Sequence, residues 1–297
     1  MKYFLLIAMI LCMLACHSSS TSEKRFSFSP EPGKKYFIST KHEMKDSWFY
    51  EKLQKTYRSV QIDMQFELVD TKDSLFQFTL TFADFKIKQP PITVIIGKTT
   101  TVFKVDSISP KENNTNNPMQ FDYYLLGLTK GLSMKVWMNK KGEVLKVDGF
   151  DKIADSVSKI SGHDKKEVRY LLKEYLGEKI VTDYLNELFC IAPDYYEKEG
   201  DSWVRNITFI SKAPVKLSSM YKIEKIHDDS LFLSQNAVIS GRANENAEPF
   251  MTGRQNGKLI VDRKTGIPYS YNAESDTKTK TSSYIDQSTQ IFTATVK

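Results

Sequence analysis

The sequence predicts a mainly antiparallel β protein of the α+β class, with two β halves on either side of a helical insert. Apolar residues alternate with polar ones along much of the chain, as in strands that bury one face. Between residues 150 and 193 the apolar spacing changes to the helical period. Turn signals then recur in similar order, which predicts two pseudo-repeated halves that form curved sheets or an unclosed barrel.

The first β half is assigned to residues 33–149. Gly33 opens a strand that runs from Tyr36 to Met44, and further strands are predicted over 62–68 and 75–82. A hairpin is predicted around the turn signal at 139–142, and residues 111–118 form a polar loop.

The insert, residues 150–193, is predicted to hold three short helices. Their apolar residues follow the i, i+3, i+4 spacing of a helix with one buried side. Gly162 and Gly177 separate the helices, and Pro193 ends the last one.

The second β half covers residues 194–297. A turn is predicted at Asn236 and a loop over 241–249. Asp73-Ser74-Leu75-Phe76 recurs as Asp229-Ser230-Leu231-Phe232, which supports the duplication. The alternative is that this tetrapeptide recurs by chance, since Asp-Ser is common turn chemistry. Candidate strands are 203–210, 220–226, 231–239, 258–261, 267–271 and 290–296.

The first 15 residues are predicted to be a targeting signal. A positive residue, Lys2, precedes an apolar run over 3–14 that is shorter than the roughly 20 residues a spanning helix needs. Met13-Leu14-Ala15-Cys16 resembles the lipobox of bacterial lipoproteins. That resemblance implies cleavage before Cys16, a lipid on its thiol, and an outer-membrane address. The alternative is a plain secretory signal.

Residues 16–32 follow as a Ser-rich tether.

The rest of the chain lacks the sequence features of several functional classes. The net charge of +6 is spread along the chain, which argues against nucleic-acid binding. The four histidines lack metal-ligand spacing, and no cofactor motif or catalytic signature occurs. Cys190 stands alone after Cys16 and is interpreted as a buried apolar residue. We therefore expect no metal, no cofactor and no enzymatic activity.

Aromatic residues supply a first set of candidate ligand-facing side chains. The chain has 18 Phe, 15 Tyr and 3 Trp. Most are expected to pack in the core. Three consecutive rings cannot all face one core, so exposed rings that contact a ligand are predicted at Trp48, Phe49 and Tyr50.

A second set consists of serines that fit an O-glycan acceptor pattern. Bacteroidetes-type bacteria attach such glycans at Asp-Ser or Asp-Thr followed by an apolar residue. Turns and helix caps explain the same tripeptide equally well. The matching residues are Ser74, Ser107, Ser156 and Ser230.

Short motifs occur from Asp106 onward: Asp106-Ser107, Asn117-Pro118, 136–149, Leu188-Phe189, Ala192-Pro193 and Gly200-Asp201-Ser202-Trp203. In these motifs the chain resembles a family of uncharacterised Bacteroidetes-type lipoproteins that is known only as a domain of unknown function. The resemblance implies no activity, so no functional residue is carried over from it. Long strands with one helical insert are also similar to envelope lipoprotein carriers.

These observations favour a lipid-anchored, non-enzymatic envelope module that binds a lipid, a glycan or a protein. The alternatives are a structural or assembly partner of an outer-membrane complex, and a hydrolase without a recognisable motif. A deep apolar cavity would indicate lipid binding, and a flat apolar patch a protein partner. Converging carboxylates or a Ser–His pair would indicate a hydrolase.

Overall fold

The protein is described from a computed structural model of the 297-residue chain. The described residues are 27–50, 52–96, 99–105, 118–189, 198–210, 214–242, 248–280 and 285–296. Within them, no helix is long and apolar enough to cross a membrane.

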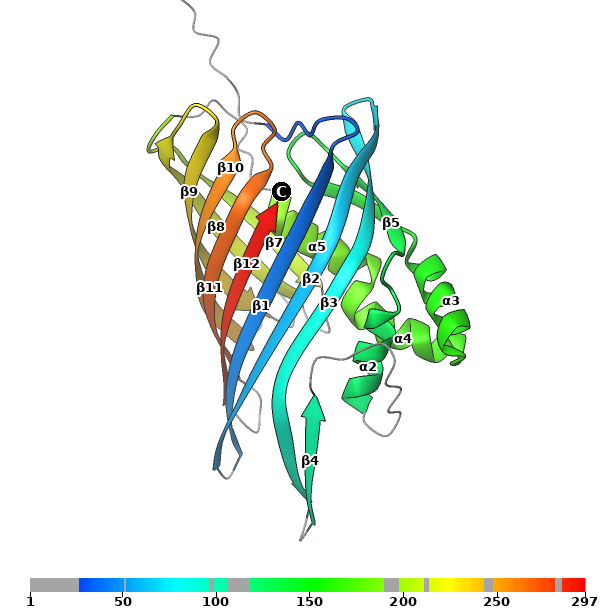
Figure 1. Cartoon of the computed structure of the whole chain (residues 1–297). Coiled ribbons are helices and arrows are strands. Elements are labelled where there is room, and N and C mark those ends of the chain that lie inside the picture. The colour runs from blue at the N-terminus through cyan, green and yellow to red at the C-terminus, as the bar shows by residue number, and fades with distance from the viewer. Residues whose placement is uncertain are drawn as a thin grey trace, which may run out of the picture.

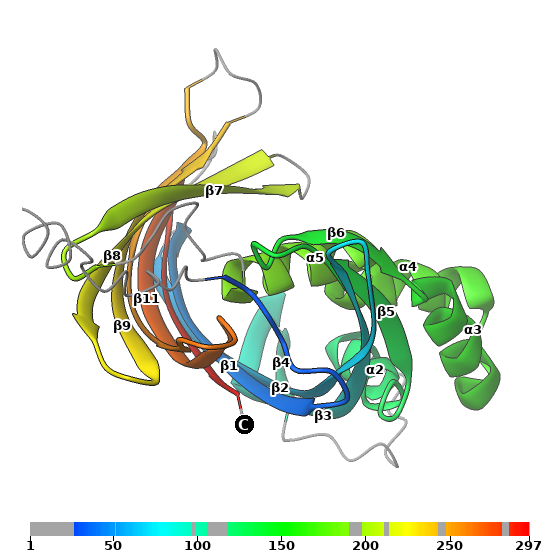
Figure 2. The ribbon, with the colours of Figure 1, turned by 90° about the horizontal axis from the view of Figure 1, so that it is seen from above.

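The described residues form a twelve-stranded antiparallel sheet that curves strongly around one face (Figures 1 and 2). The strands are β1 (Lys35–Tyr50), β2 (Lys52–Lys72), β3 (Leu75–Ile96), β4 (Thr99–Val105), β5 (Ser133–Met138), β6 (Val144–Asp148), β7 (Ser202–Ile210), β8 (Pro214–Ile226), β9 (Ser230–Gly241), β10 (Met251–Asp262), β11 (Pro268–Lys280) and β12 (Ile285–Val296).

The strand order is β6-β5-β3-β2-β1-β12-β11-β10-β9-β8-β7, with β4 paired to β3 beside this path. The first strand and the last strand therefore pair with each other, and each half of the chain runs outward from this junction as a meander. The ends of the path, β6 and β7, do not pair. The sheet is thus partly ring-closed and is not a barrel, as the sequence predicted.

Four helices accompany the sheet in the described part of the chain. They are α2 (Pro118–Gly127), α3 (Phe150–Ser161), α4 (Lys165–Leu176) and α5 (Glu178–Phe189). The predicted three-helix insert is confirmed as α3 to α5 between β6 and β7, and α2 is a helix that the sequence analysis missed. Because α5 packs against both β6 and β7, it fills the gap between the unpaired edges of the sheet (Figure 2).

Local sequence explains where the insert helices begin and end. The Asp164 carboxylate accepts hydrogen bonds from the backbone N–H groups of Lys166 at 2.9 Å and Glu167 at 3.2 Å, which caps α4. Gly162 ends α3 with φ of 73°, in the left-handed region that glycine adopts without steric cost. Gly177 lies at the junction of α4 and α5, so both predicted glycine breaks are confirmed.

Alternation along the strands decides which side chains face inward. In β9 the buried positions are Leu231, Leu233, Gln235, Ala237 and Ile239, and the residues between them are more exposed. The predicted turn at Asn236 is wrong, because this residue continues β9 and pairs with Asn256 of β10. An exposed Asn is tolerated there because its side chain points outward and leaves the ladder intact.

Several strands are longer than the alternation predicted. β3 continues past Phe82 to Ile96, although Pro90 and Pro91 carry no N–H. The pairing of β3 with β4 shifts register between Gln89 and Ile92, so these prolines fall at an irregularity rather than inside the regular ladder. The predicted hairpin at 139–142 is confirmed as the β5–β6 turn.

Residues 27–34, which we call the strap, cross one end of the sheet before β1 begins. Phe28 is 1% exposed and packs against the rings of Phe76, Phe78 and Phe189. The Phe28 N–H donates to the Lys140 carbonyl at 3.0 Å, and the Ser29 N–H donates to the Thr265 carbonyl at 2.7 Å. We call this the strap end of the sheet.

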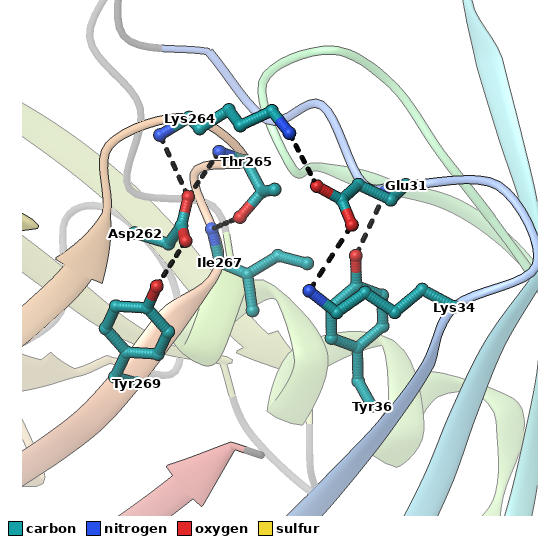
Figure 3. A network of polar contacts seen from close by, with 8 residues as sticks. All are labelled: Glu31, Lys34, Tyr36, Asp262, Lys264, Thr265, Ile267 and Tyr269. Atoms are coloured by element: carbon teal, nitrogen blue, oxygen red, sulfur yellow. Dashed lines mark hydrogen bonds and ion pairs between the residues drawn. The ribbon is translucent and has the colours of Figure 1, made fainter. Parts of the chain in front are cut away.

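Polar contacts fasten the strap to the β10–β11 turn (Figure 3). Lys264 Nζ lies 2.8 Å from Glu31 Oε1, and Lys34 Nζ lies 3.4 Å from Glu31 Oε2. Lys264 and Lys34 lower the pKa of the Glu31 carboxyl through these hydrogen bonds and their charges. Asp262 orders the turn itself by accepting hydrogen bonds from the backbone N–H groups of Lys264 and Thr265 and from the Tyr269 hydroxyl.

Candidate functional site: a cavity beneath the curved sheet

A cavity of about 420 Å³ lies between the concave face of the sheet and helices α2, α4 and α5. Two apolar walls bound it. The first wall combines β2 and β3 with two helices, and its residues are Val60, Ile62, Phe85, Ile87, Leu126 and Leu176. The second wall lies on β7 to β11, and its residues are Phe209, Val215, Leu217, Ile239, Met251 and Ala273.

The core closes the cavity toward the strap end. The Phe66 ring stacks on Phe78 at a centroid distance of 4.0 Å and on Phe189 at 5.5 Å. Toward the opposite end, which we call the far end, the lining reaches Phe209, Val215 and Met251, and all three are only partly buried. The cavity therefore extends from below the aromatic stack to the far end of the sheet.

A row of polar side chains crosses the concave face between the apolar walls. Gln255 pairs with Ser275, and Ser275 pairs with Gln290. Met44 then pairs with Gln290 on one side and with Arg58 on the other, so the row continues across β1 to β2. We call Gln255, Ser275, Gln290 and Arg58 the polar belt, and all four line the cavity.

At one end of the polar belt, Gln255 belongs to a buried hydrogen-bond network. Its amide nitrogen lies 2.8 Å from the Tyr271 hydroxyl and 3.2 Å from Gln235 Oε1. The Tyr271 hydroxyl donates to the same Gln235 oxygen at 2.6 Å, and the Gln235 amide donates to Ser219 Oγ at 2.9 Å. Buried polar groups are tolerated in an apolar interior when they satisfy one another in this way.

Glu187 brings a carboxyl group to this network from α5. Gln255 Nε2 donates to Glu187 Oε1 at 3.3 Å. The residue lies deep in the protein, but its side chain keeps accessible area because it borders the cavity. Burial raises the pKa of the Glu187 carboxyl above its usual value, and the Gln255 hydrogen bond opposes the rise only in part.

His42, Tyr175 and Arg58 line the opposite part of the cavity. His42 Nε2 lies 2.9 Å from Gln290 Oε1, and the Tyr175 hydroxyl donates to Asp122 Oδ2 at 3.2 Å. Burial and the Asp122 carboxylate raise the pKa of Tyr175 to about 12, while the positive charge of Arg58 opposes the rise. Arg58 and Tyr175 thus line the same cavity.

The sequence of the chain matches a recognised protein family. Residues 73–268 match a family of unknown function, DUF6263, and this match covers more than half of the chain. The chain belongs to the DUF6263 family. The expectation of a family of unknown function is therefore confirmed, whereas lineage and lipid attachment stay predictions.

No curated protein matches this DUF6263 chain. The solved structure "Lipid-protein interactions in lipovitellin" has 11% identity and a TM-score of 0.49, and the match covers 88% of this chain and 25% of that one. The DUF6263 chain thus spans a quarter of the lipovitellin chain.

Two further solved structures are more remote. The translocator domain of autotransporter NalP from Neisseria meningitidis has 7% identity and a TM-score of 0.30, with coverage of 97% and 96% of the two chains. OpdQ of Pseudomonas aeruginosa has 6% identity and a TM-score of 0.24, with coverage of 89% and 97%. At such values these likenesses carry no functional argument.

Of the candidate residues from the sequence, the structure describes the side chains of Ser74, Ser156 and Ser230, and none of these three lines the cavity. Cys16, Ser107 and Cys190 lie outside the described residues. Trp48, Phe49 and Tyr50 end β1, but their side chains are not described, so the prediction that their rings are exposed stays a prediction.

The three described glycan candidates lie in different settings. Ser74 is exposed in the β2–β3 turn with φ of 68°. The Ser156 hydroxyl donates to the Lys152 carbonyl within α3, and Ser230 opens β9. Their modification stays a prediction.

The sequence analysis missed polar residues of the cavity lining and the buried glutamine bonded to them: Arg58, Glu187, Gln255, Ser275, Gln290 and Gln235. A signal for two of them was present. Gln235 and Gln255 stand at positions where the alternation places apolar residues, and such a polar interruption of a buried face indicates a site. In the described part of the chain, no group of three or more His, Cys, Asp and Glu side chains converges to hold a metal ion.

Proposed function

We propose that this protein is a binding module that holds a lipid-like, amphipathic molecule in the cavity beneath its curved sheet. The cavity itself carries the proposal. Its volume of about 420 Å³ lies within the range of roughly 300–1,000 Å³ that is usual for small-molecule sites. Apolar walls with a few placed polar groups are the lining that such sites share.

The polar belt favours an amphipathic ligand over a purely apolar one. An apolar ligand would gain about 0.8 kcal/mol for each buried methylene from the two walls alone. It would leave the polar groups of Glu187, Ser275 and Arg58 facing hydrocarbon, which costs free energy. A ligand with a polar group offsets that cost.

The same lining favours binding over hydrolysis. Among the described residues that line the cavity, Glu187 is the one carboxylate, and a glycosidase needs two that converge. Its raised pKa keeps this carboxyl protonated over a wider pH range, so it is suited to donate a hydrogen bond to a bound ligand.

We further propose that a lipid on Cys16 anchors the chain in the cell envelope. The strap begins at Ser27, so the ten residues 17–26 span at most about 35 Å between the anchor and the strap end. The cavity reaches the far end, away from that anchor. Cys16→Ser should move the protein into the soluble fraction; continued pelleting with membranes contradicts the anchor and leaves the cavity proposal intact.

Native mass spectrometry of the protein purified from its own host tests ligand binding. Wild type should retain a molecule of defined mass that leaves on denaturation. Ser275→Tyr fills the cavity and should abolish retention. Asn272→Tyr places the same ring on the exposed face of β11 and should not. Far-ultraviolet circular dichroism confirms that both variants fold, and equal retention by both contradicts the proposal.

A further inference from the structure

Arg58 is the most informative polar residue of the cavity that the proposed function leaves unexplained. It lies on β2, is half-buried, and faces the cavity. Its guanidinium donates to the Met44 sulfur at 3.5 Å, and a thioether is a weak acceptor. In the part of the chain that the structure describes, no carboxylate lies within ion-pair distance of Arg58.

The nearby acids are engaged elsewhere. Asp122 accepts the hydrogen bond from Tyr175. Glu187 is bonded to Gln255, and Gln255 is four strands from β2 in the order of the sheet. The guanidinium stays charged because arginine does not lose its proton in proteins. Among the described residues the one hydrogen-bond acceptor of this half-buried charge is a thioether sulfur, so an anion that arrives from outside stabilises it.

The neighbours of Arg58 show what kind of molecule would bring that anion. Val60 and Ile62 follow on the same face of β2, at steps of about 6.8 Å toward the strap end. Ile87 and Phe85 pair with them on β3. Leu176 of α4 also lines the cavity. Arg58 therefore lies at one end of an apolar stretch of the cavity lining. This arrangement matches an amphiphile, in which a polar head group is attached to one end of an apolar chain.

We infer that the ligand of this cavity is an amphiphile with an anionic head group, and that Arg58 binds that head group while the chain lies along Val60, Ile62 and Phe85. The inference rests on the proposed function and makes it more specific. The planar guanidinium matches a carboxylate or a phosphate with two parallel N–H···O bonds. His42 lies on β1, the strand next to Arg58, and 2.9 Å from Gln290, and it offers a further polar contact to the same group.

Paired ligands that differ only in the head group test this inference. Hexadecanoate and hexadecanol share a chain length, and their dissociation constants are measured by displacement of a fluorescent fatty alcohol, at a pH where the acid is ionised. Wild type should bind hexadecanoate about 10- to 100-fold more tightly, the factor that a charge-assisted hydrogen bond supplies. A hexadecyl phosphate in a third series separates carboxylate from phosphate recognition.

Variants assign the preference to one residue. Arg58→Gln should remove the preference for hexadecanoate, so that acid and alcohol bind about equally, whereas Arg58→Lys should keep part of the preference. Arg254→Gln removes an arginine from the exposed face of β10 and should change neither ligand.

The outcomes are distinguishable. Equal binding of acid and alcohol by wild type overturns the inference and supports the proposed function. An acid preference that survives in Arg58→Gln also overturns the role of Arg58. Failure of the fluorescent alcohol and of all three ligands to bind overturns the proposed function itself.

Discussion

The strap offers the sharpest test of how this fold is held together, through Phe28→Ala. Phe28 is 1% exposed, and its ring centroid lies 5.7 Å from Phe76, 6.1 Å from Phe78 and 5.7 Å from Phe189. Phe→Ala substitutions in a packed core cost about 3–5 kcal/mol, through lost burial and the void that remains. Phe76 comes from β3 and Phe189 from α5, so the loss should reach the whole domain.

Detachment of the strap sets a limit on that loss. The strap precedes β1, and within the described residues backbone bonds join Phe28 to Lys140 and Ser29 to Thr265. Each contributes about 1 kcal/mol. If the variant releases the strap instead of keeping a void, the loss of unfolding free energy equals the free energy of strap docking. The backbone amide hydrogens of residues 28 and 29 then exchange rapidly, while those of the sheet stay protected.

Urea unfolding followed by circular dichroism measures the effect, and Phe37→Ala is the control. Phe37 lies nine residues further along on β1, is 53% exposed, and should change the free energy of unfolding by about 0.5 kcal/mol or less. The expected difference between the two variants is about 3 kcal/mol, with the same dependence on urea. Equal losses in both variants would refute the packing argument for the strap.

Three further predictions concern a turn, a titrating group and a helix cap. Gly266→Ala and Gly33→Ala both place alanine near φ of +70°, a backbone strain that costs about 1 kcal/mol. Only at Gly266 does the added Cβ also contact the strap, 2.6 Å from the Ser27 oxygen. Unequal unfolding free energies are therefore expected for the two variants, and equal values contradict the strap contact. Burial raises the pKa of Glu187, so the folded state binds the proton of this carboxyl more tightly than the unfolded state does. The group therefore stabilises the fold fully below pH 4.5 and less as the pH rises through its folded pKa. Over that rise, wild type should lose stability relative to Glu187→Gln in urea titrations, and a pH-independent difference between the two speaks against the buried carboxyl. Asp164→Ala should cost about 1 kcal/mol in thermal or urea unfolding, while Asp164→Asn, which keeps an accepting oxygen, should cost less than half of that.

The sequence was most informative where local rules decide the structure. The three insert helices follow from apolar spacing and from Gly162 and Gly177, because caps and glycine conformations act over a few residues. The β5–β6 turn follows from Asn139 and Gly142 for the same reason. Strand lengths were underestimated, since the far-end parts of β2 and β3 rely on pairing partners that are distant in sequence.

The cavity shows the limit of that reasoning. Glu187 is one of many surface-type residues in the sequence, and nothing local distinguishes it from Glu178 at the start of the same helix. Its role depends on α5 filling the gap between β6 and β7, which turns Glu187 toward Gln255. Arg58 similarly faces the cavity only because β2 pairs with β1 in a register that aligns Arg58 with Met44.

By itself, therefore, the sequence determined the class of the fold: an antiparallel, curved β protein with a three-helix insert, since alternation and helical spacing are written in neighbouring residues. Only the tertiary structure decided that β1 pairs with β12, that α5 closes the gap in the ring, and that Arg58 and Glu187 share one cavity. The physical reason is that these features arise from contacts between residues far apart in the chain. Such contacts are selected by the packing of the whole sheet and not by any local pattern.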